Sequence, residues 1–480
     1  MKKYLIIAIT GLLLSVTSEA YALEITPGGL QQALASEAAT IVDLTLTGKG
    51  DARDLQYIST LPALRTLDMS GLQIVETKSD KAIHLSRHHF PANTLPAYIF
   101  SLSKLEKVVM PSTLTKIEEG AFASSNLNTV TFGASVKTIG SWAFYKTKLS
   151  SVVLPASTDS MGTGVFADCA NLSNAGLSAT QVTELLAKTF RGCTALKTIT
   201  FPAKMTTLGA ECLLGSGLEL VSLNPSVNRI GAYALSSMPS LKSFSASDPM
   251  MEEGALYGNS ALTSVSGQKR IGDLALAGNT ALMLDSATTS QFTTLGAYAL
   301  ANNPTVRLFF NQNLKEVGEH VADGMDNLVS IKAIELEGNI PNTADHAFDG
   351  INGISGKRLW VHEDHLQSWA NHPEWSRFEL KGSTLGTDPI ISDEIAGADI
   401  KCFWQNDLLT VSASENLTGV SVYSTNGAIL AISTPQTTEA TIDLNGVADN
   451  IIVVRASTAS NSAVRINLKW AKTNSRSLQR

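Results

Sequence analysis

Cysteine is scarce in this chain, which has four among 480 residues. A chain of this length with so few cysteines is not a small scaffold held together by disulfides. Charge is also sparse, at 16% of the residues, and the formal net charge is −7. Nucleic acid and anionic membranes bind clustered basic surfaces, so this balance argues against both as partners. The apolar fraction of 44% excludes a disordered or fibrous composition.

Long apolar runs are missing from the chain after its N-terminal segment. No run there approaches the 18 residues of a membrane-spanning helix. The one marked run, residues 5–16, follows Lys2 and Lys3 and precedes the small-x-small sequence Ala20-Tyr21-Ala22. This order is typical of a secretory signal peptide. We therefore expect residues 1–22 to be removed by cleavage after Ala22. The mature chain should be secreted or displayed on the outer cell surface, without a transmembrane segment.

Catalytic motifs are missing as well: no G-x-S-x-G, H-E-x-x-H, Walker or G-x-G-x-x-G sequence stands in a workable context. We therefore expect no enzymatic activity, no cofactor and no metal. Acidic pairs recur along the chain, at Glu118-Glu119 and Glu252-Glu253. Solvated acids in turns explain them better than a catalytic carboxylate pair does.

Histidines cluster in two places. His84, His88 and His89 share one loop, for which a solvated loop and a metal- or pH-sensitive contact are both open. His362 and His365 flank two acids near the end of the repeats. A zinc site needs three or four converging ligands, so the polar face of a terminal cap is the better interpretation of this second group.

A short phrase returns about every 22 residues. Ile117-x-x-x-Ala121-Phe122 comes back as Ile139-x-x-x-Ala143-Phe144. Repeats of this period indicate a solenoid in which each coil stacks on the next. An apolar spine residue recurs in twelve copies, at Phe100, Phe122, Phe144, Phe166, Phe190, Leu213, Leu235, Leu256, Leu276, Leu300, Ala322 and Phe348.

A second landmark lies between the spine residues and predicts a short strand in each coil. Leu127-x-x-Val130-x-Phe132 is an example. Alternation should send the third and fifth residues after the leucine inward and the second and fourth outward. The strands should stack as a parallel ladder. Glycines that follow the second apolar position are expected to permit a tight turn, at Gly140, Gly209, Gly231, Gly272, Gly296 and Gly318.

The phrase resembles the BspA-like leucine-rich repeat family of surface proteins in Bacteroidetes-type bacteria. Residues 149–169, LSSVVLPASTDSMGTGVFADC, and residues 196–218, LKTITFPAKMTTLGAECLLGSGL, follow its pattern. Residues 359–378, LWVHEDHLQSWANHPEWSRF, resemble its closing unit. The resemblance implies a leucine-rich repeat solenoid and, for function, adhesion. We divide the solenoid into N-terminal repeats (23–95, with an insertion at 73–95), BspA-like repeats (96–355) and a cap (356–381).

Beyond the cap, residues 382–398 are rich in Gly, Ser, Pro and acids, which is typical of a linker. Residues 399–480 then contain short alternating strands with an Asn426-Gly427 hairpin turn, so we expect a small antiparallel β-sandwich. Its pattern resembles the sorting domain of type IX secretion cargo. A sorting signal and a plain terminal β-module are both open.

Two cysteines occupy the same repeat position, three residues after Phe166 and Phe190. Cys169 and Cys193 should therefore lie on neighbouring coils, about 4.8 Å apart. Distance allows a disulfide, but side chains at equivalent ladder positions point in parallel, which favours two buried thiols. Cys212 replaces the alanine of the phrase and should be buried too.

The outward side of the strands is the candidate binding site. Its residues are small and hydroxylated, which suits an extended recognition surface, although Thr and Ser also simply suit exposed strands. A protein or glycan ligand, such as extracellular matrix or mucin, is the expected partner, and the oligomeric state is not predicted. A structural role in the envelope is the alternative, and an unrecognised hydrolase a remote one. The candidate residues are Thr129, Thr131, Ser151, Thr198, Thr200, Ser222, Ser243, Ser245, Ser264 and Ser266.

Overall fold

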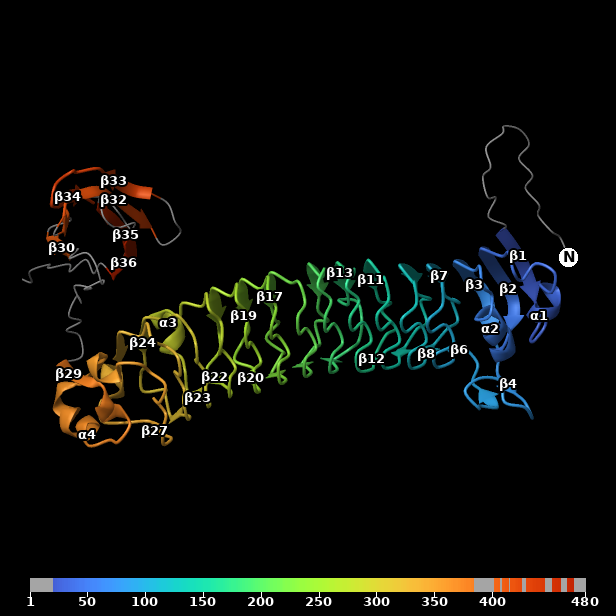
Figure 1. Ribbon diagram of the computed structural model, residues 1–480, viewed down its shortest axis with the longest axis horizontal. Coiled ribbons are helices and arrows are strands. Elements are labelled where there is room, and N and C mark those ends of the chain that lie inside the picture. Colours follow the sequence, from blue (N-terminus) through green and yellow to red (C-terminus); the bar gives the residue numbers. More distant parts are fainter. Residues whose placement is uncertain are drawn as a thin grey trace, which may run out of the picture. The chain divides into compact units, whose positions relative to one another are not determined.

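The computed structural model describes residues 20–383, 401–405, 408–413, 415–424, 429–444, 451–458 and 464–469. These residues belong to two compact units, the first of which ends at Ser383 (Figure 1). The predicted signal peptide lies outside the described residues up to residue 19, and Ala20–Ala22 are the start of strand β1. The predicted linker lies outside them from residue 384 to 398.

The first unit is a solenoid of about 16 turns, which confirms the predicted fold class. One side is a ladder of parallel strands, formed by the leucine-anchored segments that the sequence marks. The strands are β1 (Ala20–Ile25), β2 (Asp43–Gly50), β3 (Thr66–Ile74), β7 (Lys107–Val109), β9 (Thr129–Thr131), β11 (Ser151–Val153), β13 (Asn174–Gly176), β15 (Thr198–Thr200), β17 (Leu220–Ser222), β19 (Ser243–Ser245), β21 (Ser264–Ser266), β24 (Arg307–Phe309), β26 (Ser330–Lys332), β28 (Arg358–His362) and β29 (Glu379–Ser383).

A second ladder of two-residue parallel strands runs along another side of the coils, and the sequence did not predict it as a sheet (Figure 1). Its second residue points inward, as Ile117 and Ile139 do, and the first points outward. The strands are β6 (Thr94–Leu95), β8 (Lys116–Ile117), β10 (Thr138–Ile139), β12 (Ser160–Met161), β14 (Glu184–Leu185), β16 (Thr207–Leu208), β18 (Arg229–Ile230), β20 (Met250–Met251), β22 (Arg270–Ile271), β23 (Thr294–Leu295), β25 (Glu316–Val317) and β27 (Asn342–Thr343).

The third side of each coil is a turn centred on the spine residue. The residues two before and two after it have positive φ, as Tyr98 and Leu102 do on either side of Phe100. The amides of these three residues donate to carbonyls of the next coil, at Glu119, Ala121 and Ala123. Backbone hydrogen bonds thus join neighbouring coils along all three sides.

The spine residues stack as the repeat predicts. Phe122 and Phe144 lie with ring centroids 5.3 Å apart and nearly parallel planes, and Phe166 follows 5.4 Å beyond Phe144. All twelve predicted spine residues are buried, including Ala322, the weak copy. Burying one such ring contributes roughly 1.5–3 kcal/mol to folding, so this column is a main part of the core.

Replacing Phe144 with alanine should lower the free energy of unfolding by about 3–5 kcal/mol, because the ring is buried between two others. Coils couple mainly to their neighbours, so limited proteolysis should cut first between Phe122 and Phe166. Leu102→Ala is the control, because that side chain is 79% exposed and should tolerate the change. Uniform cleavage along the solenoid would contradict this account.

The six repeat glycines are needed for a different reason from the one that the sequence suggested. None of them has a positive φ, so the expected role in a tight turn is wrong. Instead, their backbone passes close to the preceding coil. A Cβ on Gly140 would lie 2.6 Å from the amide nitrogen of Glu119, and one on Gly318 would lie 2.5 Å from the carbonyl carbon of Gly296. Glycine here sets how closely the coils can stack.

Gly140→Ala should therefore destabilise the solenoid by roughly 1–3 kcal/mol, because the methyl group meets fixed backbone. Gly176→Ala is the matched control: its Cβ would lie 3.4 Å from the nearest atom, a side-chain methyl of Val153. Chemical denaturation of the two variants measures the difference. Equal losses would show that the close approach does not limit stacking.

Short helices fill the coils near the two ends of the solenoid (Figure 1). Asp51 begins α2 with a capping box that Asp54 completes. The buried Asp54 carboxylate also accepts from the amides of Gly28 and Leu30 in the preceding coil. The helices are α1 (Leu30–Ala33), α2 (Ala52–Ile58), α3 (Ser286–Thr289), α4 (Leu366–Ala370), and the 3₁₀ turns η1 (Ile334–Leu336), η2 (Ile354–Gly356), η3 (Glu363–His365) and η4 (Trp375–Arg377).

The predicted insertion contains a small antiparallel hairpin, β4 (Thr77–Lys78) with β5 (His89–Phe90). The second unit has two antiparallel sheets, ordered β30-β31-β34 and β33-β32-β35-β36. The Asn426-Gly427 turn lies outside the described residues. The strands are β30 (Lys401–Gln405), β31 (Leu408–Ser412), β32 (Leu417–Ser424), β33 (Ile429–Ser433), β34 (Glu439–Asp443), β35 (Ile451–Thr458) and β36 (Val464–Lys469).

Candidate binding surface

Seven successive strands of the first ladder, β9 to β21, present an outward surface without a charged residue, which we call the strand face. Each strand has three residues, of which the first and third point outward, because side chains alternate along a strand. The outward residues are Thr129, Thr131, Ser151, Val153, Asn174, Gly176, Thr198, Thr200, Leu220, Ser222, Ser243, Ser245, Ser264 and Ser266.

Parallel pairing places equivalent side chains in rows along the solenoid. Ser151 pairs with Asn174, and Asn174 with Thr198, while Leu220 is followed by Ser243 and Ser264. Hydroxyl groups of neighbouring coils touch within such a row: Ser245 Oγ donates to Ser222 Oγ over 3.1 Å. The strand face is thus a regular field of short polar side chains.

The structure places all ten predicted residues on the strand face. Ser243 and Ser245 are half-buried and the other eight are exposed. Two apolar residues were missed: Val153 is 71% and Leu220 is 61% exposed. The rule that gave the hydroxylated residues also marks these two, so the description of the row as small and hydroxylated was incomplete.

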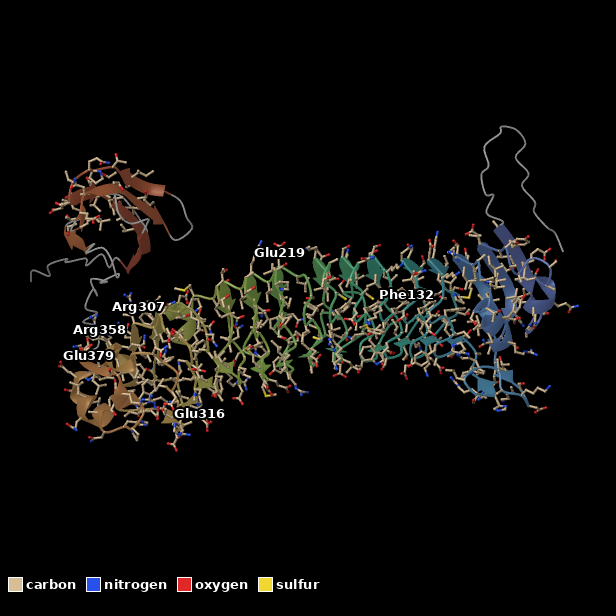
Figure 2. All side chains as sticks on the ribbon, viewed as in Figure 1. Phe132, Glu219, Arg307, Glu316, Arg358 and Glu379 are labelled. Atoms are coloured by element: carbon tan, nitrogen blue, oxygen red, sulfur yellow. The ribbon has the colours of Figure 1, made fainter. Side chains whose placement is uncertain are left out.

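Charge returns at both ends of the strand face. Lys107 stands at the outward position before it, and Arg307, Lys332 and Arg358 follow it on β24, β26 and β28. Figure 2 shows Arg307, Arg358 and Glu379 gathered toward the C-terminal end of the solenoid. The outward strand positions are therefore uncharged only from β9 to β21, and the exposed Lys197, Glu219 and Lys242 stand just before β15, β17 and β19.

The acidic pairs are not simply solvated turn acids, as the sequence suggested. The phenol of Tyr98 donates to Glu119 over 2.6 Å across the coil boundary, and Tyr233 donates to Glu253 over the same distance. The carboxylate beside each phenol raises the pKa of Tyr98 and raises that of Tyr233 to about 12. We call these contacts the two Tyr–Glu pairs.

The first acid of each acidic pair, Glu118 or Glu252, accepts hydrogen bonds from the preceding coil. Glu118 accepts from the amide of Ala97 and from Arg87, and Glu252 accepts from the amide of Ala232. Burial opposes the charge of Glu118, but the Arg87 hydrogen bond and its positive charge outweigh burial and lower the pKa of this carboxyl. Each acidic couple therefore fastens two coils together.

The histidine loop is docked on the solenoid rather than fully solvated. His84 contacts the Gln56 side-chain oxygen through Nδ1 and the Ala97 carbonyl, 2.7 Å away, through Nε2. His88 and His89 are exposed, and His89 contacts Glu76. Within the described part of the chain, no group of three or more His, Cys, Asp or Glu side chains is arranged to hold a metal ion.

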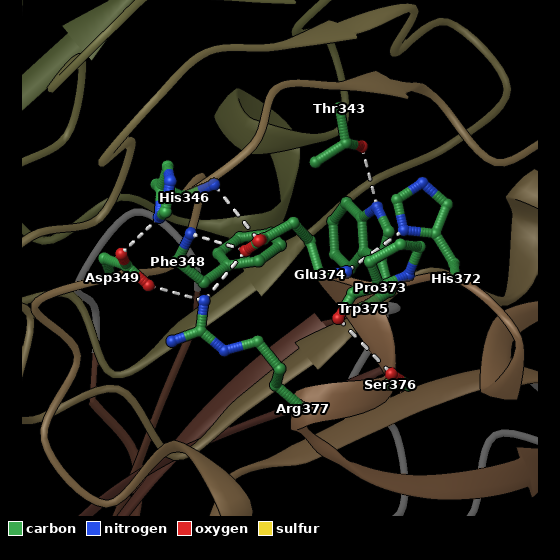
Figure 3. A network of polar contacts seen from close by, with 10 residues as sticks. All are labelled: Thr343, His346, Phe348, Asp349, His372, Pro373, Glu374, Trp375, Ser376 and Arg377. Atoms are coloured by element: carbon green, nitrogen blue, oxygen red, sulfur yellow. Dashed lines mark hydrogen bonds and ion pairs between the residues drawn. The ribbon is translucent and has the colours of Figure 1, made fainter.

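The C-terminal cap ends the backbone ladder with a carboxylate (Figure 3). In earlier coils the amides around the spine residue donate to the next coil, but the coil of Phe348 has no repeat after it. Glu374 supplies the acceptors instead. One carboxylate oxygen accepts a hydrogen bond from the amide of His346 over 3.1 Å, and the other accepts one from the amide of Phe348 over 3.3 Å. This side chain stands in for the missing coil.

An ion-pair network holds Glu374 in place. Arg377 bonds both Glu374 and Asp349, and His346 bonds Asp349. The Arg377 and His346 hydrogen bonds lower the pKa of Asp349, and the Asp349 contact raises the pKa of His346. His362 and His365 also belong to the cap; both are half-buried, and their ring centroids lie 5.7 Å apart.

Glu374→Gln should weaken the last coil by roughly 1–3 kcal/mol, because an amide keeps one acceptor and turns its NH₂ group toward the other backbone amide. Hydrogen exchange of the His346 and Phe348 amides should speed up. Glu319→Gln, an exposed change in an adjacent coil, is the control. Unchanged protection of both amides would show that Glu374 does not terminate the ladder.

The cysteines within the solenoid are buried free thiols. Cys169 and Cys193 do not form a disulfide; their Sγ atoms donate over 3.1 Å to the carbonyls of Phe144 and Phe166. Burial raises the pKa of Cys169 to about 11 and that of Cys212 further. These thiols are poor nucleophiles and serve as small core groups.

A hollow of about 170 Å³ lies where the helix-bearing first coils meet the coil of Phe100. Leu61, Leu64 and Leu105 form part of its lining, and Leu102 is exposed beside them.

None of the described helices has the length and apolar character that crossing a bilayer requires.

The sequence matches a known family of repeats. The family described as "BspA type Leucine rich repeat region" matches six copies over residues 93–187, 177–283 and 257–358. Together these segments cover more than half of the chain. No curated protein matches the sequence.

Several solved structures are similar to the chain. A leucine-rich repeat protein from Bacteroides ovatus is 18% identical with a TM-score of 0.33, over 59% of this chain and 91% of that one. The pneumococcal vaccine antigen PcpA is 14% identical with a TM-score of 0.36, over 78% and 91%. A leucine-rich cell surface protein from Faecalibacterium prausnitzii is 18% identical with a TM-score of 0.33, over 64% and 86%.

Proposed function

Because the chain belongs to the BspA type leucine-rich repeat family, we propose that it is an exported surface protein that binds a macromolecular partner through its strand face and has no enzymatic activity. The observation that carries this proposal is the uncharged outward surface of β9 to β21. Backbone groups there are paired within three successive sheets, in which β9 pairs with β7, β13 lies between β11 and β15, and β19 lies between β17 and β21. The outward side chains are left for contacts with a partner.

The chemistry of the strand face favours a protein or glycan with neutral polar groups. Rows of hydroxyls can both donate and accept hydrogen bonds. Val153 and Leu220, exposed among these hydroxyls, supply the apolar contact area that the hydroxyls lack. Extracellular matrix proteins and mucin present such groups, and the proposed adhesive role would use them.

The expected signal peptide at residues 1–22 and the C-terminal unit support export. We propose cleavage after Ala22, and a sorting role in type IX secretion for the unit after residue 398. Two antiparallel sheets, each hydrogen-bonded within itself, give this unit a core of its own around Leu409, Val420 and Val454. Fractionation that finds the processed protein only in the cytoplasm would overturn the export proposal.

The strand-face proposal is tested by solid-phase binding of the purified protein to matrix proteins, mucin and glycans. Changing Thr129, Thr131, Thr198 and Thr200 to lysine should weaken binding by roughly tenfold or more, because charges then stand in a neutral interface. The matched control adds the same four lysines at exposed positions off this face, at Ser112, Ser160, Thr183 and Ser226.

Each outcome has a meaning. Loss confined to the strand-face variant would support binding there. Equal loss in both variants would place the effect in net charge rather than in the strand face. Absence of any saturable binding would favour the structural role in the envelope, and deletion of the protein should then disturb envelope integrity without changing attachment.

A further inference from the structure

The two Tyr–Glu pairs are built alike, although six coils separate them. In each, the tyrosine of one coil covers a glycine of the next: a Cβ on Gly120 would lie 2.2 Å from the Tyr98 ring, and one on Gly254 would lie 2.3 Å from the Tyr233 ring. The same sequence, Glu-Glu-Gly-Ala, supplies the acid and the glycine both times, at 118–121 and 252–255. The recurrence indicates one device used twice.

The ring in each device lies on the outside of the solenoid. At the position of Gly120, other coils carry side chains that reach solvent, such as Lys188, Glu211 and His346. The tyrosine ring occupies the space that such a side chain would fill. The Tyr98 ring rests on the backbone of Gly120, and this residue is 38% exposed. The Tyr233 ring rests on Gly254 in the same way, but the residue is half-buried and its ring centroid lies 6.3 Å from that of Tyr257, edge to face.

The carboxylate beside each ring is exposed and has no cation of its own. Glu118 and Glu252 pair with arginines, at Arg87 and Arg229. Among residues 20–383, no Lys, Arg or His lies within ion-pair distance of Glu119 or Glu253, whose contact is the phenol. Each pair thus places an aromatic ring next to an unneutralised negative charge, and at the second pair Tyr257 adds another ring.

We propose that the two Tyr–Glu pairs form a recognition surface for lysine and arginine side chains of an extended, basic segment of a partner protein. A cation over a tyrosine face is attracted by the ring's quadrupole, and arginine also stacks on the ring. A phenol that donates to a carboxylate has a more electron-rich ring, which strengthens this attraction. Glu119 and Glu253 then neutralise the bound cation.

The spacing of the pairs defines the segment further. Six coils at the strand spacing separate them by about 29 Å. An extended peptide covers this distance in about nine residues. The chain's net charge of −7 favours a basic partner at longer range. This surface lies on the turn side of the coils, away from the strand face, and does not depend on the function proposed above.

The test uses the purified full chain and a synthetic Gly/Ser peptide with two arginines nine residues apart, measured by isothermal titration. Glu119→Gln with Glu253→Gln should weaken binding by about tenfold, because both carboxylates lose their charge. The control, Glu184→Gln with Glu316→Gln, removes the same charge from exposed positions of the second ladder that have no aromatic ring contact.

A second variant removes the rings and keeps the acids. The double variant Tyr98→Leu with Tyr233→Leu should also weaken binding severalfold. Thermal melting curves of this variant and of the glutamine variants show whether the solenoid is intact. A peptide with its arginines three residues apart should bind more weakly than the nine-residue spacing. The strand-face lysine variant and its off-face lysine control change the net charge equally, so the two should bind this peptide equally well.

Three results would overturn the proposal. The first is equal weakening by the control pair, which would reduce the effect to net charge. The second is full binding by the leucine variant, which would remove the rings from recognition. The third is binding of neutral oligosaccharides, but not of the peptide, at the Tyr–Glu pairs, which would assign the surface to glycans.

Discussion

Backbone hydrogen bonding between successive coils is the constraint on which the rest of this protein depends. Most coils donate along two ladders of short parallel strands, each divided into several sheets, and along the turn that contains the spine residue. For those bonds to align, every coil must return its backbone to the same place after about 22 residues. The spine phenylalanines, the close glycines and the left-handed turn residues all serve that return.

A ladder of this kind must be stopped, because its last coil would otherwise leave amides unpaired. At the C-terminal end, the carboxylate of Glu374 accepts hydrogen bonds from two backbone amides that would otherwise donate to a further coil. Arg377 fixes the carboxylate and Trp375 packs against Phe348, so one short segment closes both the hydrogen bonds and the core. The predicted closing unit is therefore a cap with an identifiable chemical role.

Because the backbone polar groups are hydrogen-bonded between coils, neighbouring coils can differ mainly in their outward side chains. The strand face uses this freedom for neutral hydroxyls, and the turn side uses it for Tyr–Glu pairs. Two kinds of surface thus coexist on one repetitive frame.

The sequence by itself determined the solenoid, the spine and the alternation that places Thr129 and Thr198 outward, because period and apolar spacing are local properties. It did not determine the second ladder, the reason for Gly140, the docking of the insertion by His84, or the pairing of Tyr98 with Glu119. Those depend on which side chains meet across a coil boundary, about twenty residues apart. Only stacking brings such residues together, so only the tertiary structure could decide them.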